Sequence, residues 1–402
     1  MERSAAAAAA AGWGTWRTRE FPALLGAILL VGVAGNLSIH LLGIALQQRG
    51  TSAVLIGLST ALQALGIVLA ACCTPWLLRR VGTARLALWG CTMAGLAFLA
   101  CGAVEDVAAV TALRVAFAVG HGVVFTVAEY VLLARTAARR RSTAIAAYAT
   151  AFAIGAALAP AVVGLLGPDH PANYLVGAGC LLGAAALVGA VRMRGRVEPI
   201  APASFGAIAR AAPLALLAAL MFGLLDNGLL SFLSLFALET GASVPDASWL
   251  AAAAFFGIVV LQLPLGWLGD RFDPGAVLLT CAVLALAVLV ALPQVVGVRP
   301  ALFVMAFLLG GLCDAFYVLG LAMLGRQVAP ARLATANACF IACCGLGEVA
   351  GPLVAGGALG WSPGAFLWVF VVLIAVACFA LNRGARPGVA AAPAARADGA
   401  PA

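Results

Sequence analysis

The sequence predicts an all-α integral membrane protein whose twelve transmembrane helices form two pseudo-symmetric six-helix bundles. Three observations carry this prediction: twelve long apolar segments, arginines gathered in alternate gaps between these segments, and a second half that repeats the first. Composition agrees, because 64% of the residues are hydrophobic and only 9% are charged. Together these features exclude a soluble globular domain.

Each expected helix is set by length and hydropathy, since a bilayer core about 30 Å thick requires roughly 20 apolar residues per helix. In chain order the segments are 22–46, 52–77, 84–104, 108–134, 144–167, 172–192, 211–238, 248–268, 275–296, 300–325, 334–359 and 363–382. Residues 1–20 carry an alanine run, Trp13 and Trp16, without the basic-then-apolar order of a signal peptide. We expect them to lie at the membrane interface.

The remaining boundaries follow from these segments. We assign residues 21–193 to the N-terminal six-helix bundle, 194–210 to a cytoplasmic connecting loop and 211–383 to the C-terminal six-helix bundle. Residues 384–402 are rich in Ala, Pro and Arg, a composition typical of a disordered tail.

Arginine placement predicts the orientation of the chain in the membrane. All 23 basic residues are arginines: 20 fall in one set of gaps, Arg49 and Arg299 fall in the other set, and Arg114 lies inside a helix. Basic residues near span ends stay on the cytoplasmic side. We therefore expect a multi-pass protein of the bacterial inner (plasma) membrane with both termini in the cytoplasm. The net charge of +8 reflects this excess and suits anionic lipid headgroups rather than nucleic acid.

The two halves superpose at an offset of about 191 residues. Residues 75–80 fall on 266–271, Asn36 falls on Asn227, and Gly155 and Pro160 fall on Gly347 and Pro352 at an offset of 192. Two halves with the same orientation imply a symmetry axis along the membrane normal.

These motifs resemble the major facilitator superfamily of secondary transporters, and its small bacterial efflux members in particular. The loop from Gly266 to Arg271, with Asp270 inside it, is similar to the family's Gly-x-x-x-Asp-Arg loop. The first-half copy keeps Arg80 but has Arg79 where the acid would stand. Arg114 matches the family's membrane arginine, and the fifth helix holds a degraded Gly-Pro motif of the kind found in antiporters. The resemblance implies alternating access to a central solute site.

Polar residues gather on helix faces, and charge inside a bilayer usually faces a cavity. At 100° per residue, Arg114, His121 and Glu129 share one face of the fourth helix. Arg114 and Glu129 are roughly 22 Å apart along the axis, too far to pair directly. Asn36 and His40 form a similar stripe on the first helix.

The second half adds a stripe containing Asn227, with Asp226 turned about 100° away on an ideal helix. Asp314 and Tyr317 lie in the tenth helix, and Glu348 lies in the eleventh. We predict that these residues line a central site for solute and protons. Such a site suits a small amphipathic or cationic metabolite or drug. The alternative for each residue is a hydrogen bond between buried helices.

Two further roles are predicted. A carboxylate beside an arginine at a helix end can hold two helices together as a latch. We predict this role for the loop with Gly266, Asp270 and Arg271, and for Arg80 in the equivalent loop of the first half. The alternative is a charge cluster that only fixes topology. Pro160 and Pro352 can bend their helices and act as hinges, although packing alone could also explain them.

The predicted function is proton-coupled export by alternating access. Proton-coupled uptake is the alternative, followed by a non-transporting sensor or a lipid flippase on the same scaffold. No catalytic dyad, nucleophile elbow or phosphate-binding loop points to an enzyme, and no cofactor or metal is predicted. The expected partners are a small solute, protons and the lipid bilayer, without nucleic acid, and the protein is expected to be a monomer.

The topology can be tested with single cysteines on a cysteine-free background. A membrane-impermeant thiol reagent added outside the cell should label Cys at positions of Glu105 and Ser243, and should miss Cys at the position of Arg139. The opposite pattern of labelling would contradict the orientation.

Overall fold

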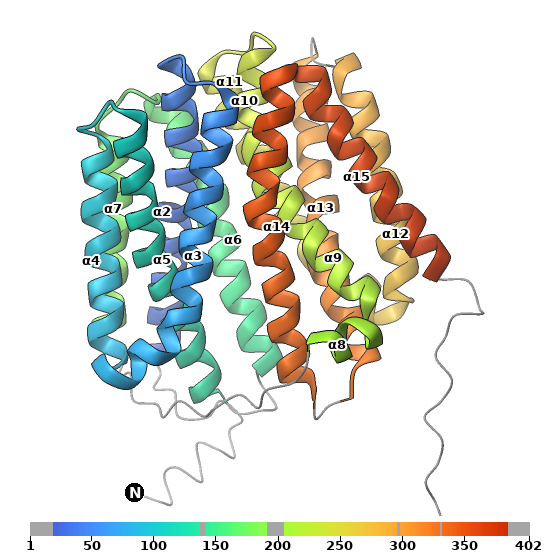
Figure 1. Cartoon of the computed structure of the whole chain (residues 1–402), viewed down its shortest axis with the longest axis horizontal. Coiled ribbons are helices and arrows are strands. Elements are labelled where there is room, and N and C mark those ends of the chain that lie inside the picture. Colours follow the sequence, from blue (N-terminus) through green and yellow to red (C-terminus); the bar gives the residue numbers. More distant parts are fainter. Residues whose placement is uncertain (1–18, 137–140, 191–204, 296–297, 330–331, 385–402) are drawn as a thin grey trace, which may run out of the picture.

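The computed structural model describes residues 19–136, 141–190, 205–295, 298–329 and 332–384. Within these residues, twelve helices are long and apolar enough to cross a membrane, as the sequence predicts, and the regular structure is helical throughout. The helices stand side by side, the first six at one side of the molecule and the last six at the other (Figure 1).

The first six spans form the N-terminal bundle. They are α2 (Glu20–Gln48), α3 (Ala53–Val81), α4 (Thr83–Cys101), α5 (Val107–Arg135), α6 (Arg141–Leu166) and α7 (Ala172–Ala190). We call the face of the molecule at which Glu20 and Gly384 lie the terminal face, and the face at which Gln48 and Ala53 lie the distal face. Successive helices run alternately between these two faces.

The last six spans form the C-terminal bundle. The first of them is divided into α9 (Pro213–Gly223), a π-helical segment η2 (Leu224–Leu230) and α10 (Ser231–Glu239). The others are α11 (Val244–Arg271), α12 (Pro274–Ala291) with a short 3-10 turn η3 (Leu292–Val295), α13 (Arg299–Gln327), α14 (Leu333–Trp361) and α15 (Pro363–Gly384).

The structure differs from the sequence prediction between the bundles. Residues 205–211, expected in a loop, form a short helix, α8 (Phe205–Ala211), at the terminal face (Figure 1). Ile208 is buried there, so the helix packs against the bundle. The predicted interfacial segment, most of the connecting loop and the tail lie outside the described residues.

Side-chain caps set where several helices begin. Asp106 accepts a hydrogen bond from the Ala109 amide at 2.8 Å at the start of α5. Asp273 accepts one from the Ala276 amide at 2.8 Å at the start of α12. Each cap satisfies an amide that has no carbonyl partner in the first helical turn.

Glycines bring helix backbones into contact at equivalent places in the two bundles. In the N-terminal bundle, Gly32 of α2 lies against Gly155 of α6. In the C-terminal bundle, Gly223 of α9 lies against Gly347 of α14. The four positions are related by the sequence repeat. Because lipid provides no hydrophobic drive for helix association, such close packing is a main source of stability within each bundle.

Gly347→Ala should therefore lower the stability of the folded protein. A β-carbon there would overlap the Leu220 carbonyl oxygen and approach the Leu224 amide, so α14 and α9 must separate. We expect a loss of about 1–3 kcal/mol, typical of an overfilled core. Thermal unfolding in detergent measures it.

Gly357→Ala is the matched control, because Gly357 lies in the same helix with nothing within 4 Å of its added β-carbon. Its unfolding temperature should stay at the wild-type value or rise slightly. Equal losses for both variants would show that the α9–α14 contact is not what matters.

Candidate solute and proton-coupling site

Three carboxyl groups meet at mid-height of the C-terminal bundle. Asp226 lies in η2, Asp314 in the middle of α13 and Glu348 in the middle of α14. The charge of Asp226 interacts with those of both Asp314 and Glu348. Asp314 is buried, and its Oδ2 atom has no hydrogen-bond partner among the described residues. The structure thus brings together three of the predicted site residues.

The π-helical segment positions the acidic group on the seventh span. Asn227 Nδ2 donates a hydrogen bond to the Glu348 carbonyl at 2.8 Å, which ties η2 to α14. Ser231 Oγ donates to the Asp226 carbonyl, five residues earlier, at 3.1 Å. The angle of 100° per residue assumed for this span fails here, because a π turn contains more residues than an α turn.

The carboxyl cluster has no cation of its own. In the C-terminal bundle the arginines of the described chain stand only at helix ends, at Arg271, Arg299, Arg326, Arg332 and Arg383. All three histidines of the protein belong to the first half. Carboxylates held together in a low-dielectric interior repel each other, so protons or a positively charged ligand must neutralise them.

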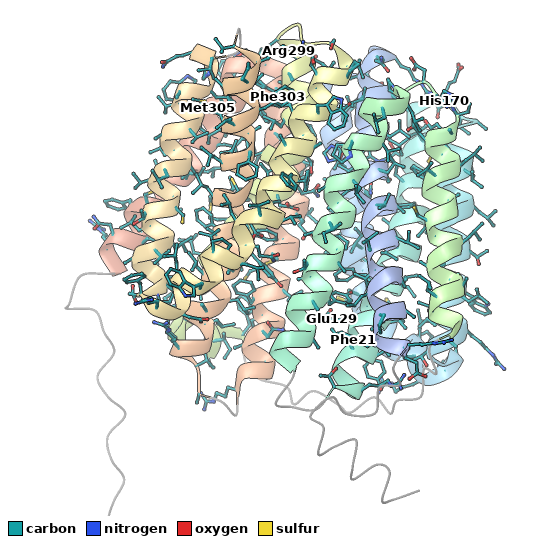
Figure 2. All side chains as sticks on the ribbon, turned by 180° about the vertical axis from the view of Figure 1, so that it is seen from behind. Phe21, Glu129, His170, Arg299, Phe303 and Met305 are labelled. Carbon is teal, nitrogen blue, oxygen red and sulfur yellow. The ribbon has the colours of Figure 1, made fainter. Side chains whose placement is uncertain are left out.

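Glu129 forms a second polar group at the seam between the bundles. It is half-buried on α5, and its charge interacts with Tyr148 of α6 and Tyr317 of α13. Tyr317 also interacts with the charges of Asp314 and Glu348, so it is near both Glu129 and members of the carboxyl cluster. Glu129 stands in the half of the molecule nearer the terminal face (Figure 2).

Tyr148 is a site residue that the sequence analysis missed. Its hydroxyl donates a hydrogen bond to the Phe125 carbonyl at 3.2 Å, and its ring packs edge-on against the Phe125 ring. Tyrosine inside an apolar helix was the available signal, since the whole chain holds only 4 tyrosines.

Arg114 does not join this site. It is fully buried, and its guanidinium donates to three side chains of α3: Gln63 Oε1 at 2.8 Å, Ser59 Oγ at 3.1 Å and Thr60 Oγ1 at 3.1 Å. Among the described residues it makes no ion pair with a carboxylate. The shared face with Glu129 exists, but in this conformation Arg114 joins α5 to α3.

His121 and Asn36 also serve contacts within the N-terminal bundle. His121 Nε2 hydrogen-bonds to the Val31 carbonyl at 3.2 Å, and the ring stacks on Phe117. Asn36 Nδ2 donates to the Gly32 carbonyl of its own helix at 3.2 Å. In this structure, His121 makes a hydrogen bond between helices and Asn36 makes one within its own helix, as in the alternative to a role at the solute site.

His40 lies at the seam instead. Its ring packs edge-on against Phe255 of α11, with ring centroids 5.3 Å apart, so it crosses from one bundle to the other. The side chain is 1% exposed, and neither ring nitrogen has a hydrogen-bond partner in the part of the chain that is described.

The bundles touch each other in the distal half of the molecule. Gln47 Nε2 donates a hydrogen bond to Glu239 Oε1 at 2.7 Å. Gly57 of α3 lies against the backbone of α14 at Pro352, and Gly164 of α6 lies against the indole of Trp249 on α11. The structure is therefore closed between the bundles at the distal face.

The predicted latch loop makes no such closure at the terminal face. Asp270 is exposed and forms no ion pair among the described residues. Arg326 of α13 donates to the Gly269 carbonyl at 2.7 Å and to the Phe272 carbonyl at 3.3 Å, capping the end of α11. Its role as a latch stays a prediction, for a conformation closed at the terminal face.

The repeat is visible in the side chains near this loop. Arg80 lies over the Trp76 ring at 4.3 Å, and Arg271 lies over the Trp267 ring at 5.3 Å. Each pair is a cation–π contact at the terminal end of a helix. Gly266 leaves open space, with the nearest atom 3.9 Å from an added β-carbon.

Both predicted hinge prolines lie inside unbroken helices, Pro160 in α6 and Pro352 in α14. Pro352 stands at the distal seam against Gly57. A role as hinges stays a prediction. A central cavity also stays a prediction, because a groove of about 710 Å³ lies between α6, α11 and α13 rather than at the carboxyl cluster.

An all-α fold of two six-helix bundles, with ionisable groups inside the membrane-spanning region, defines a membrane transporter. The model of the Major Facilitator Superfamily matches residues 23–239 and 215–401, so the chain belongs to this family. An uncharacterised MFS-type transporter of Bacillus subtilis (strain 168), YfkF, is 24% identical over 361 residues, which cover 86% of this chain and 91% of that protein.

Solved structures share the fold at low sequence identity. A bacterial homologue of the human lysosomal transporter Spinster, in an inward-facing and occupied conformation, has a TM-score of 0.74 at 18% identity, over 90% of this chain and 96% of that one. The nucleoside transporter NupG has a TM-score of 0.75 at 14% identity, over 92% and 100%. A D-xylose-proton symporter has a TM-score of 0.69 at 12% identity, over 89% and 95%.

Arg114→Lys should destabilise the protein even though it keeps the charge. The three nitrogens of the planar Arg114 guanidinium each donate a hydrogen bond to a different side chain of α3. The single ammonium group of lysine cannot reach all three acceptors. Losing at least one charge-assisted hydrogen bond should cost about 2 kcal/mol or more of stability. Thermal unfolding in detergent measures it.

Arg326→Lys is the control, because Arg326 is exposed and bonds to backbone carbonyls at a helix end. Its effect on unfolding should be small. If Arg114→Lys unfolded like the wild type yet lost transport, Arg114 would instead act in the transport cycle, as the family resemblance implies.

Proposed function

We propose that the protein exports a small amphipathic or cationic solute in exchange for protons, by alternating access between its two bundles. In this proposal the terminal face is cytoplasmic and the membrane is the bacterial inner membrane. Arginine placement supports the orientation, since the arginine-rich gaps all open at the terminal face.

The observation that carries the proposal is the carboxyl cluster of Asp226, Asp314 and Glu348, which has no arginine or histidine within it among the described residues. Either protons or a cationic group of the solute can neutralise it. Both act on the same carboxyl groups, so binding of one favours release of the other. Mutual displacement at a shared site is the simplest physical basis for exchange.

Glu129 supplies a route between this cluster and the cytoplasm. It is half-buried on the terminal side, and Tyr317 interacts both with its charge and with those of Asp314 and Glu348. A carboxyl that is dry in one conformation and hydrated in the other will hold its proton in the first and release it in the second. Glu129 is therefore the proposed coupling group, with Tyr148 and Tyr317 beside it.

The closed distal face supports an inward-facing state for this structure. Gln47, His40 and the glycines at the seam seal the bundles on the side opposite Glu129. A solute from the cytoplasm would load in this state. Rocking the bundles would open the distal face and expose the cluster to the other side.

Uptake by proton symport uses the same groups and differs in one respect: solute and proton would bind together rather than displace each other. A proton-release measurement separates the two. A cation that binds is added to the purified protein in weakly buffered detergent. The protein should then release protons if it works by exchange and take up protons if it works by symport.

The solute is sought first by thermal shift, because a ligand at about 100 times its Kd stabilises the folded state by about 2.7 kcal/mol. Ethidium, a planar fluorescent cation, serves as the first probe, beside a panel of organic cations and neutral amphipathic metabolites. If no cation raises the unfolding temperature while neutral solutes do, the cationic part of the proposal is wrong.

Glu129→Gln should abolish ethidium transport driven by a pH gradient in proteoliposomes, while exchange of ethidium down its own gradient survives. The amide keeps the shape and neutrality of the protonated carboxyl but cannot release a proton. Asp314→Asn should lose both activities, because it weakens the cation site itself. Glu105→Gln, which removes an exposed carboxylate at the distal face, is the matched control and should transport normally.

Full uphill transport by Glu129→Gln, with the pH dependence of the wild type, would exclude Glu129 as the coupling group. Asp226 or Asp314 would then take that role.

A further inference from the structure

An open, largely apolar groove lies on the outer surface of the molecule, away from the carboxyl cluster. It has a volume of about 710 Å³ and runs between α6 of the N-terminal bundle and α11 and α13 of the C-terminal bundle. Ile154 and Leu158 line it from α6, and Trp249 and Phe256 line it from α11. These four side chains are all at least 36% exposed, so the groove faces the membrane.

The distal end of this groove is polar. Asp246 and Arg299 line it, and they also line a smaller adjoining cavity of about 230 Å³ that contains Thr240 and Ser243. Arg299 and Asp246 form an ion pair, and Ser243 Oγ donates a hydrogen bond to Asp246 Oδ2 at 2.8 Å. Arg299 and Phe303 stand together at this end of α13 (Figure 2).

We propose that this groove binds a zwitterionic phospholipid from the distal leaflet, with one acyl chain in the apolar part and the headgroup at Asp246 and Arg299. The phosphate would face the guanidinium of Arg299, and the ammonium would face the carboxylate of Asp246. An ion pair with one charge of each sign complements a headgroup that has both. An anionic headgroup would gain the contact with Arg299 but would be repelled by Asp246.

The groove offers more than ordinary contact with lipid. The groove is open to the membrane but is lined by three helices, so a chain lying in it meets more protein atoms than it would on a single helix face. Its walls also belong to both bundles. A lipid held there contacts α6 and α11 beside the Gly164–Trp249 contact and therefore stabilises the closed distal face. This site does not depend on the identity of the solute or on proton coupling.

Trp249 lies in the groove and can report occupancy by its fluorescence. We would keep Trp249 as the single tryptophan, replace the others with Phe, and reconstitute the protein with lipids brominated on the acyl chain. The probes are dibromo-phosphatidylethanolamine and dibromo-phosphatidylglycerol, each diluted into unbrominated phosphatidylcholine. A matched protein keeps only Trp368 of α15, which is 62% exposed on a lipid-facing helix away from the groove.

Bromine on phosphatidylethanolamine should quench Trp249 at a mole fraction roughly fivefold lower than it quenches Trp368, a ratio that corresponds to about 1 kcal/mol. Dibromo-phosphatidylglycerol should quench Trp249 less strongly than dibromo-phosphatidylethanolamine. Replacing both Asp246→Asn and Arg299→Gln should remove the difference between the two lipids. Identical quenching of Trp249 and Trp368 by both lipids would mean ordinary boundary lipid only and would overturn the proposal.

Native mass spectrometry tests the site in a protein that keeps all its tryptophans. The wild type should retain one phosphatidylethanolamine after release from mixed micelles. Ala253→Phe, which fills the groove from α11, should lose it. Val372→Phe places the same aromatic side chain at an exposed position of α15 and should behave like the wild type. Equal retention by Ala253→Phe and the wild type would contradict the site, whatever the fluorescence variants do.

Discussion

Each charge between the two faces of the membrane must find its polar partners inside the protein, because lipid offers none. This constraint accounts for the positions of the arginines. Most arginines stand at helix ends, where water and headgroups solvate them. Arg114 is fully buried and is met by three acceptors on one neighbouring helix. In the C-terminal bundle, Asp314 Oδ2 has no such partner among the described residues, and this difference is why the carboxyl groups there are the basis of the proposed binding site.

The packing divides the molecule into parts that stay together and parts that can move. Within each bundle, glycines bring backbones so close that no side chain fits between them, as at Gly155 and Gly347. Between the bundles, the contacts at the distal seam include hydrogen bonds from Gln47 to the Leu235 carbonyl and to Glu239 Oε1, an aromatic contact at His40 and several glycine contacts. Tightly packed bundles are what a rocking motion requires, since two such bundles can separate without repacking internally.

The twelve spans could be predicted because length and hydropathy alone determine them. The repeat could be predicted because equivalent positions of the two halves carry the same or similar residues. The site was only partly predictable. Asp314 and Glu348 were found because a carboxyl in an apolar helix is rare, but the π turn around Asp226 depends on contacts with α14 that no local pattern encodes. The sequence likewise showed that Arg114 lies inside a helix, yet its partners Ser59, Thr60 and Gln63 are tertiary contacts from another helix.

The two tryptophan–arginine stacks have a mechanical consequence. Trp76 with Arg80 and Trp267 with Arg271 occupy equivalent positions of the repeat at the terminal face, and both indoles are about half exposed. Indole rings favour the headgroup level and resist displacement in either direction. Each bundle is thus held at the same depth in the membrane by its own tryptophan–arginine pair. These two pairs oppose a translation of one bundle past the other along the membrane normal. Tilting of the bundles about an axis near the terminal face then requires less energy than such a translation.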